Sequence, residues 1–235
     1  MSKANRIGLF GCSNLYGYHH AFADAVLGAN KLEKLNAYLD EHVYNTKNIT
    51  DQVTHNGTTI SNHSFPGCGN TYINEMLKQK LDDMDYVFVQ FTGLTRIDVP
   101  GYVEGFPFQH NGWVFSGGQN GYWKQHDTTV SMFTDHYSRS TEDTVQDNLA
   151  VIKQTVDMLE QSNKPYNWCF YYDLAKTNKE DHEPLVLDTN NKFIDSDPHT
   201  HCFTMGKGAD DGVHFMYDGY RDWLCKIKHQ LNLPR

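Results

Sequence analysis

A short apolar run near the start of the chain leads directly into a glycine-flanked serine, and this junction limits the possible folds most. The run is Arg6-Ile7-Gly8-Leu9-Phe10, and Gly11, Ser13 and Gly17 follow it. Glycines on both sides of a serine permit a tight turn, because they have no Cβ atom to clash with nearby backbone. A buried strand that ends in such a turn is typical of a parallel α/β sheet that holds a serine hydroxyl above its edge.

The rest of the chain alternates between helical and β patterns. Apolar residues recur at helical spacing in segments 19–27, 31–39, 71–84, 141–163 and about 214–231. β-rich runs lie at 6–10, 59–65, 85–92 and 166–173. Strands that alternate with helices favour a parallel sheet with helices on both faces. We therefore expect one three-layer α/β/α domain over residues 1–235, with a mostly parallel, flavodoxin-like sheet.

Three stretches do not fit this alternation. Residues 93–137 show no clear period and carry many glycines and aromatic residues, so we expect a long insertion without regular structure. Residues 43–58 are expected to be irregular or to form a small hairpin, and residues 174–210 to be rich in loops.

A second motif, Asp211-Gly212-Val213-His214, lies ahead of the last helical pattern. A serine hydroxyl is a weak nucleophile and needs a base to remove its proton. Together, the Gly-x-Ser turn and the Asp-x-x-His pair resemble the first and last sequence blocks of the SGNH hydrolases, also called GDSL esterases and lipases. The resemblance implies that Ser13 is the nucleophile, His214 the general base and Asp211 the carboxylate that orients the imidazole. Asp210 is a second acid beside this pair.

The same resemblance implies an oxyanion hole made of N–H donors. In the family these are the N–H of the nucleophile, a glycine N–H of a second block and an asparagine amide of a third block. The second block resembles Pro66-Gly67-Cys68-Gly69-Asn70, where Gly67 is the expected donor and Gly69 the alternative. A turn that only closes a strand explains the same residues equally well.

The third block departs from the family pattern, which is usually Gly-x-Asn-Asp. Here the strand continues as Thr92-Gly93-Leu94-Thr95-Arg96, without an asparagine. Loss of one oxyanion donor typically costs about 3 kcal/mol of transition-state stabilisation, so another group substitutes or activity is weak. The candidate substitutes are Thr92, Thr95, Arg96 and the nearby Asn70. Arg96 is alternatively a clamp for an anionic group of the substrate.

Cys12 replaces the aspartate of the GDSL signature, which is structural in the family. A catalytic thiol at Cys12 competes with the serine, but Ser13 has the expected register. Five cysteines without paired spacing indicate free thiols rather than a disulfide framework. A regulatory disulfide between Cys12 and Cys68 stays open, because both lie on expected site loops.

The aromatic residues of segment 93–137 bear on the substrate. They include Tyr102, Phe106, Phe108, Trp113, Phe115, Tyr122 and Trp123. Exposed rings among Asn, Gln and His suit stacking on sugars, while a lid that packs its own core would use the same residues. We expect a small acyl ester as substrate, with an O-acetylated carbohydrate favoured over a lipid. The alternative is a non-catalytic glycan-binding or structural protein on the same scaffold.

Charge and composition argue against several other classes of protein. The net charge of −9 argues against nucleic-acid binding, which needs a basic face. Without a signal-peptide core or a membrane-length apolar run, we expect a cytoplasmic protein with no membrane partner. Ser-His-Asp chemistry needs neither cofactor nor metal, although the His-x-His of segment 195–202, with acids nearby, leaves a metal-dependent hydrolase as a weaker alternative. The oligomeric state is left open.

Overall fold

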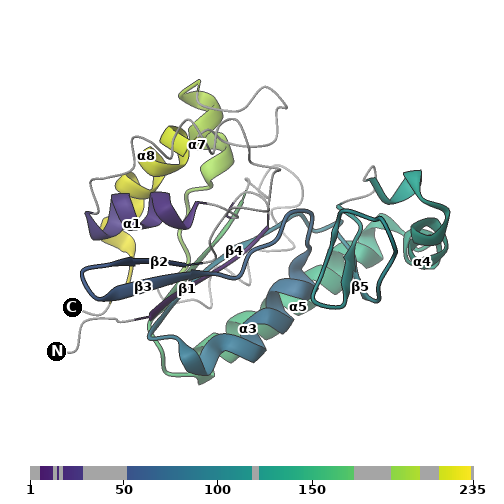
Figure 1. Ribbon diagram of the computed structural model, residues 1–235, viewed down its shortest axis with the longest axis horizontal. Helices are drawn as coiled ribbons and strands as arrows, with labels where there is room; N and C mark the ends of the chain where they lie inside the picture. Colours follow the sequence, from purple (N-terminus) through teal and green to yellow (C-terminus); the bar gives the residue numbers. More distant parts are fainter. Residues whose placement is uncertain are drawn as a thin grey trace.

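A five-stranded sheet forms the centre of the protein (Figure 1). The computed structural model describes residues 6–12, 15, 18–28, 52–117, 122–171, 192–206 and 217–233. In spatial order the strands are β2 (Gln52–His55), β3 (Thr58–Asn62), β1 (Arg6–Phe10), β4 (Tyr86–Phe91) and β8 (Tyr166–Phe170). All pair in parallel except β2, which is antiparallel to β3. This confirms the expected mostly parallel sheet.

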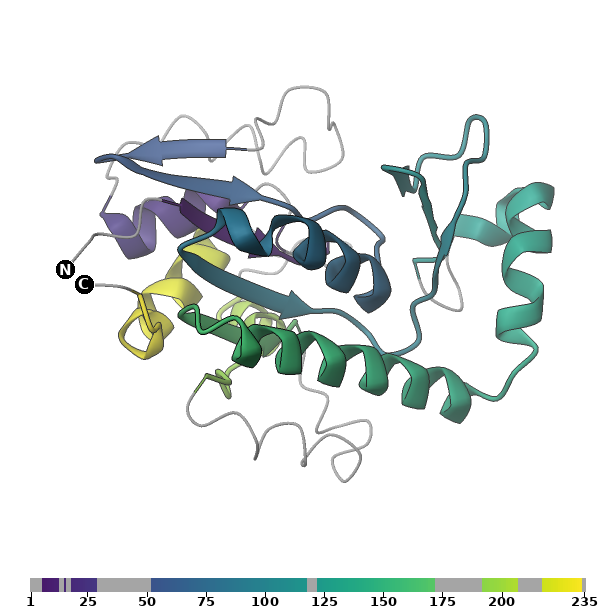
Figure 2. The ribbon, with the colours of Figure 1, turned by 90° about the horizontal axis from the view of Figure 1, so that it is seen from below.

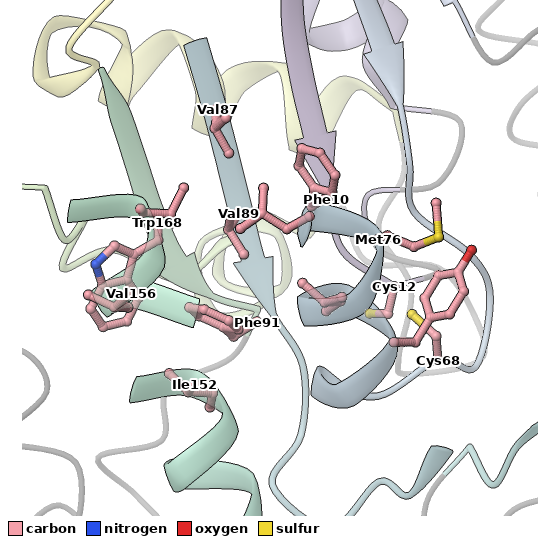
Figure 3. Close-up of a cluster of buried hydrophobic side chains, with 14 of the residues drawn as sticks. Phe10, Cys12, Cys68, Met76, Val87, Val89, Phe91, Ile152, Val156 and Trp168 are labelled. Atoms are coloured by element: carbon pink, nitrogen blue, oxygen red, sulfur yellow. The ribbon is translucent and has the colours of Figure 1, made fainter. Parts of the chain in front are cut away.

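Helices cover both faces of this sheet, so the expected three layers are present (Figures 1 and 2). One face carries α1 (His19–Leu27) and α8 (Tyr217–Ile227), and α7 (Pro198–Thr204) packs beside α8. The other face carries α3 (Asn70–Lys80) and α5 (Thr141–Gln161). The 3₁₀ turns η2 (Leu81–Asp83) and η4 (Lys228–Gln230) follow α3 and α8. Figure 3 shows the buried side chains between the sheet and the α3–α5 layer.

The start of α5 illustrates how local sequence sets an element. Ser140 is the N-cap, and its Oγ accepts a hydrogen bond from the Asp143 N–H at 3.0 Å. Glu142 and Asp143 lie in the first turn, where acidic side chains interact favourably with the helix dipole. A cap of this kind contributes about 1 kcal/mol. The helix predicted over 141–163 is therefore confirmed, and it ends at Gln161.

Segment 93–137 corrects the expectation of an insertion without regular structure. It forms a three-stranded antiparallel sheet of β5 (Asp98–Pro100), β7 (Trp113–Phe115) and β6 (Gln109–His110), followed by η3 (Tyr122–Gln125) and α4 (Asp127–Tyr137). These strands have two or three residues each, which is too short to show an alternating pattern. Figure 2 shows this unit beyond the carboxyl ends of β3 and β4.

The unit has a small core of its own. Val103, Phe106, Val114, Trp123 and Phe133 are buried together. The alternative in which the aromatic residues pack a core of the unit therefore accounts for Phe106, Phe108 and Trp123, while Phe115 packs in the core of the central sheet. Among the aromatic side chains that the structure describes in this segment, Tyr102 differs from these, with 74% of its surface exposed.

Two further stretches contain regular elements. β2 and the start of β3 form the small hairpin that was one expectation for 43–58, and its turn residues, Asn56 and Gly57, both have positive φ (49° and 77°). Within 174–210, Asp197 caps α7, because its Oδ1 accepts from the Thr200 N–H at 2.6 Å. The predicted helix over 31–39 lies outside the described residues. None of the helices in the described segments is long and apolar enough to cross a membrane.

Candidate active site

The first and second sequence blocks meet at the carboxyl edge of the central sheet. The carbonyl oxygen of Gly11, which follows β1, accepts hydrogen bonds from the Phe65 N–H at 3.3 Å and from the Cys68 thiol at 3.2 Å. Cys12 and Cys68 lie side by side and are fully buried (Figure 3). The chain that leads into Ser13 is thus fixed directly to the second block.

Asn70 joins the second block to the third. Its side-chain oxygen accepts from the Thr92 N–H at 2.9 Å, and its amide donates to the Asn148 Oδ1 at 3.0 Å and weakly to the Thr92 carbonyl at 3.5 Å. The Asn148 amide in turn donates to the Arg96 and Thr144 carbonyls, both at 3.1 Å. Asn70 is fully buried, so this network is shielded from water. In this structure the Asn70 amide holds the third block in place.

The two candidate glycines of the second block differ in their surroundings. The Gly69 N–H donates to the Asp98 Oδ1 at 2.7 Å and is therefore occupied. Gly67 has a φ of +82°, and a Cβ atom there would lie 2.9 Å from the Phe108 ring, so only glycine fits. The Gly67 N–H makes no hydrogen bond within the described part of the chain. Of the two predicted donors, Gly67 is therefore the one whose N–H is not occupied by another described residue.

Asp98 is a site residue that the sequence analysis missed. Its two carboxylate oxygens accept from the Gly69 and Tyr72 N–H groups at 2.7 and 2.8 Å, which caps the start of α3. Burial raises the pKa of Asp98 to about 6, although the two N–H groups and the charge of Arg96 act in the opposite direction. Asp98 is separated from α3 in the sequence, so no local sequence pattern predicts that it caps this helix.

Several buried polar groups at the ends of β3 and β4 have no hydrogen-bond partner among the described residues. They include the Asn62 amide nitrogen, the Ser64 hydroxyl and the Thr92 hydroxyl. Each residue is at most 5% exposed. Because a buried polar group without a partner is costly, such groups are expected to meet a ligand, water or another part of the chain. Of the predicted third-block candidates, Thr92 is the one that carries such a group.

The other third-block candidates are held differently. The Thr95 carbonyl accepts from the Tyr137 hydroxyl at 3.1 Å. The Arg96 guanidinium donates from Nη1 to the Cys68 carbonyl at 3.0 Å, so it reaches back to the second block. The structure therefore brings together Gly67, Asn70 and Arg96 with the loop that begins at Thr92.

Ser13, Asp211 and His214, with the neighbouring Asp210, lie outside the described residues. Their described neighbours in the chain are Cys12 and Tyr217, the first residue of α8. The Tyr220 hydroxyl, one turn into α8, accepts from the Gln90 amide at 3.2 Å. Gln90 is near the carboxyl end of β4, so the start of α8 lies at the same edge as the three blocks.

The alternatives that use a thiol or a metal receive less support from the geometry. Cys12 is fully buried, and burial raises the pKa of the Cys68 thiol, which disfavours a reactive thiolate. In the 195–202 segment Asp197 caps α7, and the His199 ring packs against Tyr171 and Phe203. Within the described ranges, no group of three or more His, Cys, Asp or Glu residues is arranged to hold a metal ion.

His63, which follows β3, resembles a catalytic base by position but differs by environment. Its ring stacks on Phe10 with centroids 4.9 Å apart, and its Nε2 is buried without a partner in the described chain. Burial, assisted by the charge of Lys80, lowers the pKa of His63 to about 4. We therefore interpret His63 as a neutral ring that packs against the core.

Comparisons with known proteins add a weak structural likeness. No protein-family model matches the sequence, and no curated protein matches it in sequence. Among solved structures, the chain is similar to the psychrotrophic esterase EstA from Pseudoalteromonas sp., in a structure inhibited by monoethylphosphonate. The TM-score is 0.45 and the sequence identity 11%, over 97% of this chain and 96% of the esterase. A likeness at this level supports no conclusion about the fold or the activity of this chain.

The Asn70 network predicts an unequal response to two asparagine substitutions in α3. We expect Asn70→Ala to lower the free energy of unfolding by about 2–4 kcal/mol, because it strands the Thr92 N–H and the Asn148 Oδ1 in a buried site. Asn74→Ala, one turn later, removes a single hydrogen bond to Gln154 and should cost less than half as much. Urea unfolding of both variants checks this. Equal losses of unfolding free energy would contradict the special role of the Asn70 network.

His63 predicts a change of stability with pH. Its folded-state pKa is below the unfolded value of about 6.5, so its contribution is complete above that value and is lost as the pH falls toward 4. Relative to His63→Phe, which keeps the ring on Phe10, the wild type should lose on the order of 2 kcal/mol between pH 7 and pH 5. Urea unfolding at both pH values checks this. Parallel behaviour of the two proteins would show that His63 does not titrate in this way.

Proposed function

We propose that the protein is a serine esterase of SGNH type that hydrolyses an acyl ester with Ser13, His214 and Asp211. The supporting observation is the junction of the three blocks at one edge of the sheet. Gly11 is bonded to Cys68, Asn70 to Thr92, and Arg96 to the Cys68 carbonyl. Residues distant in sequence are thereby held together where open α/β sheets bind ligands.

Chain connectivity is compatible with a triad at this edge. Ser13 follows Cys12 directly, and His214 precedes Tyr217 by three residues. Three residues of extended chain span at most about 11 Å. The turn η4, which follows the end of α8, is at the opposite edge, because the Gln230 carbonyl accepts from the side chain of Asn167 near the start of β8. The start of α8 therefore faces the edge at which β1 ends.

The chemistry follows from these positions. The Ser13 Oγ attacks the ester carbonyl while His214 takes its proton, and Asp211 orients the imidazole. The C–O bond to the alcohol then breaks, and His214 returns the proton to the leaving oxygen. A water molecule, deprotonated by His214, attacks the acyl-enzyme and releases the acid, which restores Ser13.

The negative charge on the carbonyl oxygen needs donors that are already in place. We assign this role to the Gly67 N–H and to the Thr92 hydroxyl. The Thr92 hydroxyl takes the place of the third-block asparagine of the family. Both donors are unoccupied within the described residues. A donor that is fixed before the reaction avoids the cost of reorganisation during it. The Thr92 backbone is held by Asn70 in this way.

For the substrate we favour an O-acetylated carbohydrate. A groove of about 240 Å³ on the hairpin of β6 and β7 is lined by Tyr102, His110 and Trp113, among others. The His110 ring stacks on Phe65 of the second-block loop at 4.4 Å, which links the groove to the candidate active site. Aromatic rings with polar neighbours suit the apolar faces of sugar rings.

The same groove supports a second candidate function, the binding of a glycan without turnover. Tyr102 is 74% exposed beside the groove, which fits a stacking platform. A protein of this kind would bind sugars independently of Ser13.

Hydrolysis of p-nitrophenyl acetate tests the esterase. We expect Ser13→Ala and His214→Ala to lose about 10³-fold or more of kcat/KM, because each removes a member of the triad. Ser138→Ala and His229→Ala are the matched controls, because they alter exposed residues, and their kcat/KM should stay within about twofold of wild type. Cys12→Ala tests the thiol alternative, and its kcat/KM should also stay within about twofold if Cys12 is not the nucleophile. A serine-reactive phosphonate should label the wild type and not Ser13→Ala. Wild-type turnover no faster than that of Ser13→Ala would reject the esterase for this substrate.

Titration with acetylated xylo-oligosaccharides, followed by tryptophan fluorescence, tests the groove. We expect saturable binding that Tyr102→Ala weakens by about tenfold through loss of ring stacking. Met205→Ala, which truncates another exposed apolar side chain, should leave the binding unchanged. Binding that persists in Ser13→Ala without wild-type turnover would favour the glycan-binding function. Equal effects of the two substitutions would remove the groove from the proposal.

A further inference from the structure

A second cavity, of about 190 Å³, lies at the seam between the central domain and the 93–137 unit. Its walls come from the start of α3, the first turns of α5, the end of α4 and the loop that contains Arg96. Figure 2 shows α4 and α5 meeting at this seam. At about 30 Å³ per water molecule, the cavity has room for a small anion or for the charged end of a larger ligand.

The loop that carries Arg96 is fixed from several directions. The Arg96 carbonyl accepts from the Asn148 amide at 3.1 Å, and its Nη1 donates to the Cys68 carbonyl at 3.0 Å. The preceding Thr95 carbonyl accepts from the Tyr137 hydroxyl at 3.1 Å. α5, α4 and the second block thus position one guanidinium before any ligand arrives, which lowers the entropy cost of binding.

Among the described residues, most donors of the Arg96 guanidinium find no acceptor. Arginine carries five N–H donors, and the Nη1 bond to Cys68 is the one that Arg96 makes within the described chain. No carboxylate of the described residues lies within ion-pair distance of it. Arg96 is also one of the residues that line the cavity.

The other lining groups fit a negatively charged ligand. Arg139 adds a second guanidinium, one nitrogen of which pairs with Asp147, and Thr71 and Thr144 also border the cavity. Two carboxylates line it as well, but both are engaged. Asp98 caps α3 through two N–H groups, and Asp147 pairs with Arg139.

We propose that this cavity binds a small oxyanion group, a phosphate or a carboxylate, with Arg96 as its principal donor and Arg139 at its side. A planar guanidinium matches both groups, because it donates two parallel N–H bonds to two oxygens. The inference goes beyond ester hydrolysis and does not depend on it, since binding of the anion is measured without turnover.

The test is a titration of the full chain with inorganic phosphate and, separately, with acetate, at constant ionic strength, followed by NMR chemical shifts. We expect saturation by at least one anion, at least tenfold weaker binding in Arg96→Gln and about threefold weaker binding in Arg139→Gln. Lys153→Gln removes a positive charge from the exposed face of α5 and should change binding by less than twofold. Saturation by phosphate alone would indicate a tetrahedral group, and saturation by acetate alone a carboxylate.

Two results would overturn the proposal. One is the absence of saturation by either anion up to about 50 mM, a concentration at which a site of millimolar affinity is filled. The other is equal weakening by Arg96→Gln and Lys153→Gln, which would reflect net charge rather than a site. If circular dichroism shows that Arg96→Gln does not fold, Arg139→Gln decides, because its side chain is half exposed and its loss leaves the core intact.

Discussion

The buried hydrogen bonds between Asn70, Thr92 and Asn148 are the constraint on which the candidate site depends. They connect the start of α3, the end of β4 and the first turns of α5, three elements that are far apart in the sequence. In a buried setting such bonds are both strong and costly to leave incomplete, so they favour a single arrangement. The loop after β4 therefore has a defined position, and with it the Thr92 hydroxyl and the Arg96 guanidinium.

The small sheet of the 93–137 unit is held against this edge by aromatic contacts. Phe65, in the loop before the second block, stacks on His110 at 4.4 Å and packs on Phe115 at 5.6 Å. Phe108 occupies the space that a side chain at Gly67 would need. The unit thus borders the second block, and its attachment requires a glycine at the position of the proposed oxyanion donor. The same aromatic packing therefore fixes both the 93–137 unit and the second-block loop that contains Gly67.

Local signals predicted the central fold because they reside in contiguous residues. The cap at Ser140 and the continuous apolar run of β4 each specify an element without reference to distant chain. The α4 helix was missed because Val130, Phe133 and Tyr137 pack on the small core of the unit, in a segment dominated by glycines and aromatic residues. The roles of Asn70 and Asp98 depend on partners 22 to 78 and 26 to 29 residues away, so no local pattern carries them.

At position 12, where the GDSL pattern has an aspartate, a cysteine suits the surroundings. Cys12 belongs to the buried apolar cluster that also contains Phe10, Met76 and Phe91, and the Cys68 thiol lies beside it (Figure 3). A carboxylate there would lose its hydration, at a cost of several kcal/mol unless it gained a charged or N–H partner. The nearby Gly11 carbonyl is an acceptor and is already bonded to Cys68, so it offers a carboxylate no compensation. A thiol, which packs as a small apolar group, suits this position without any such partner.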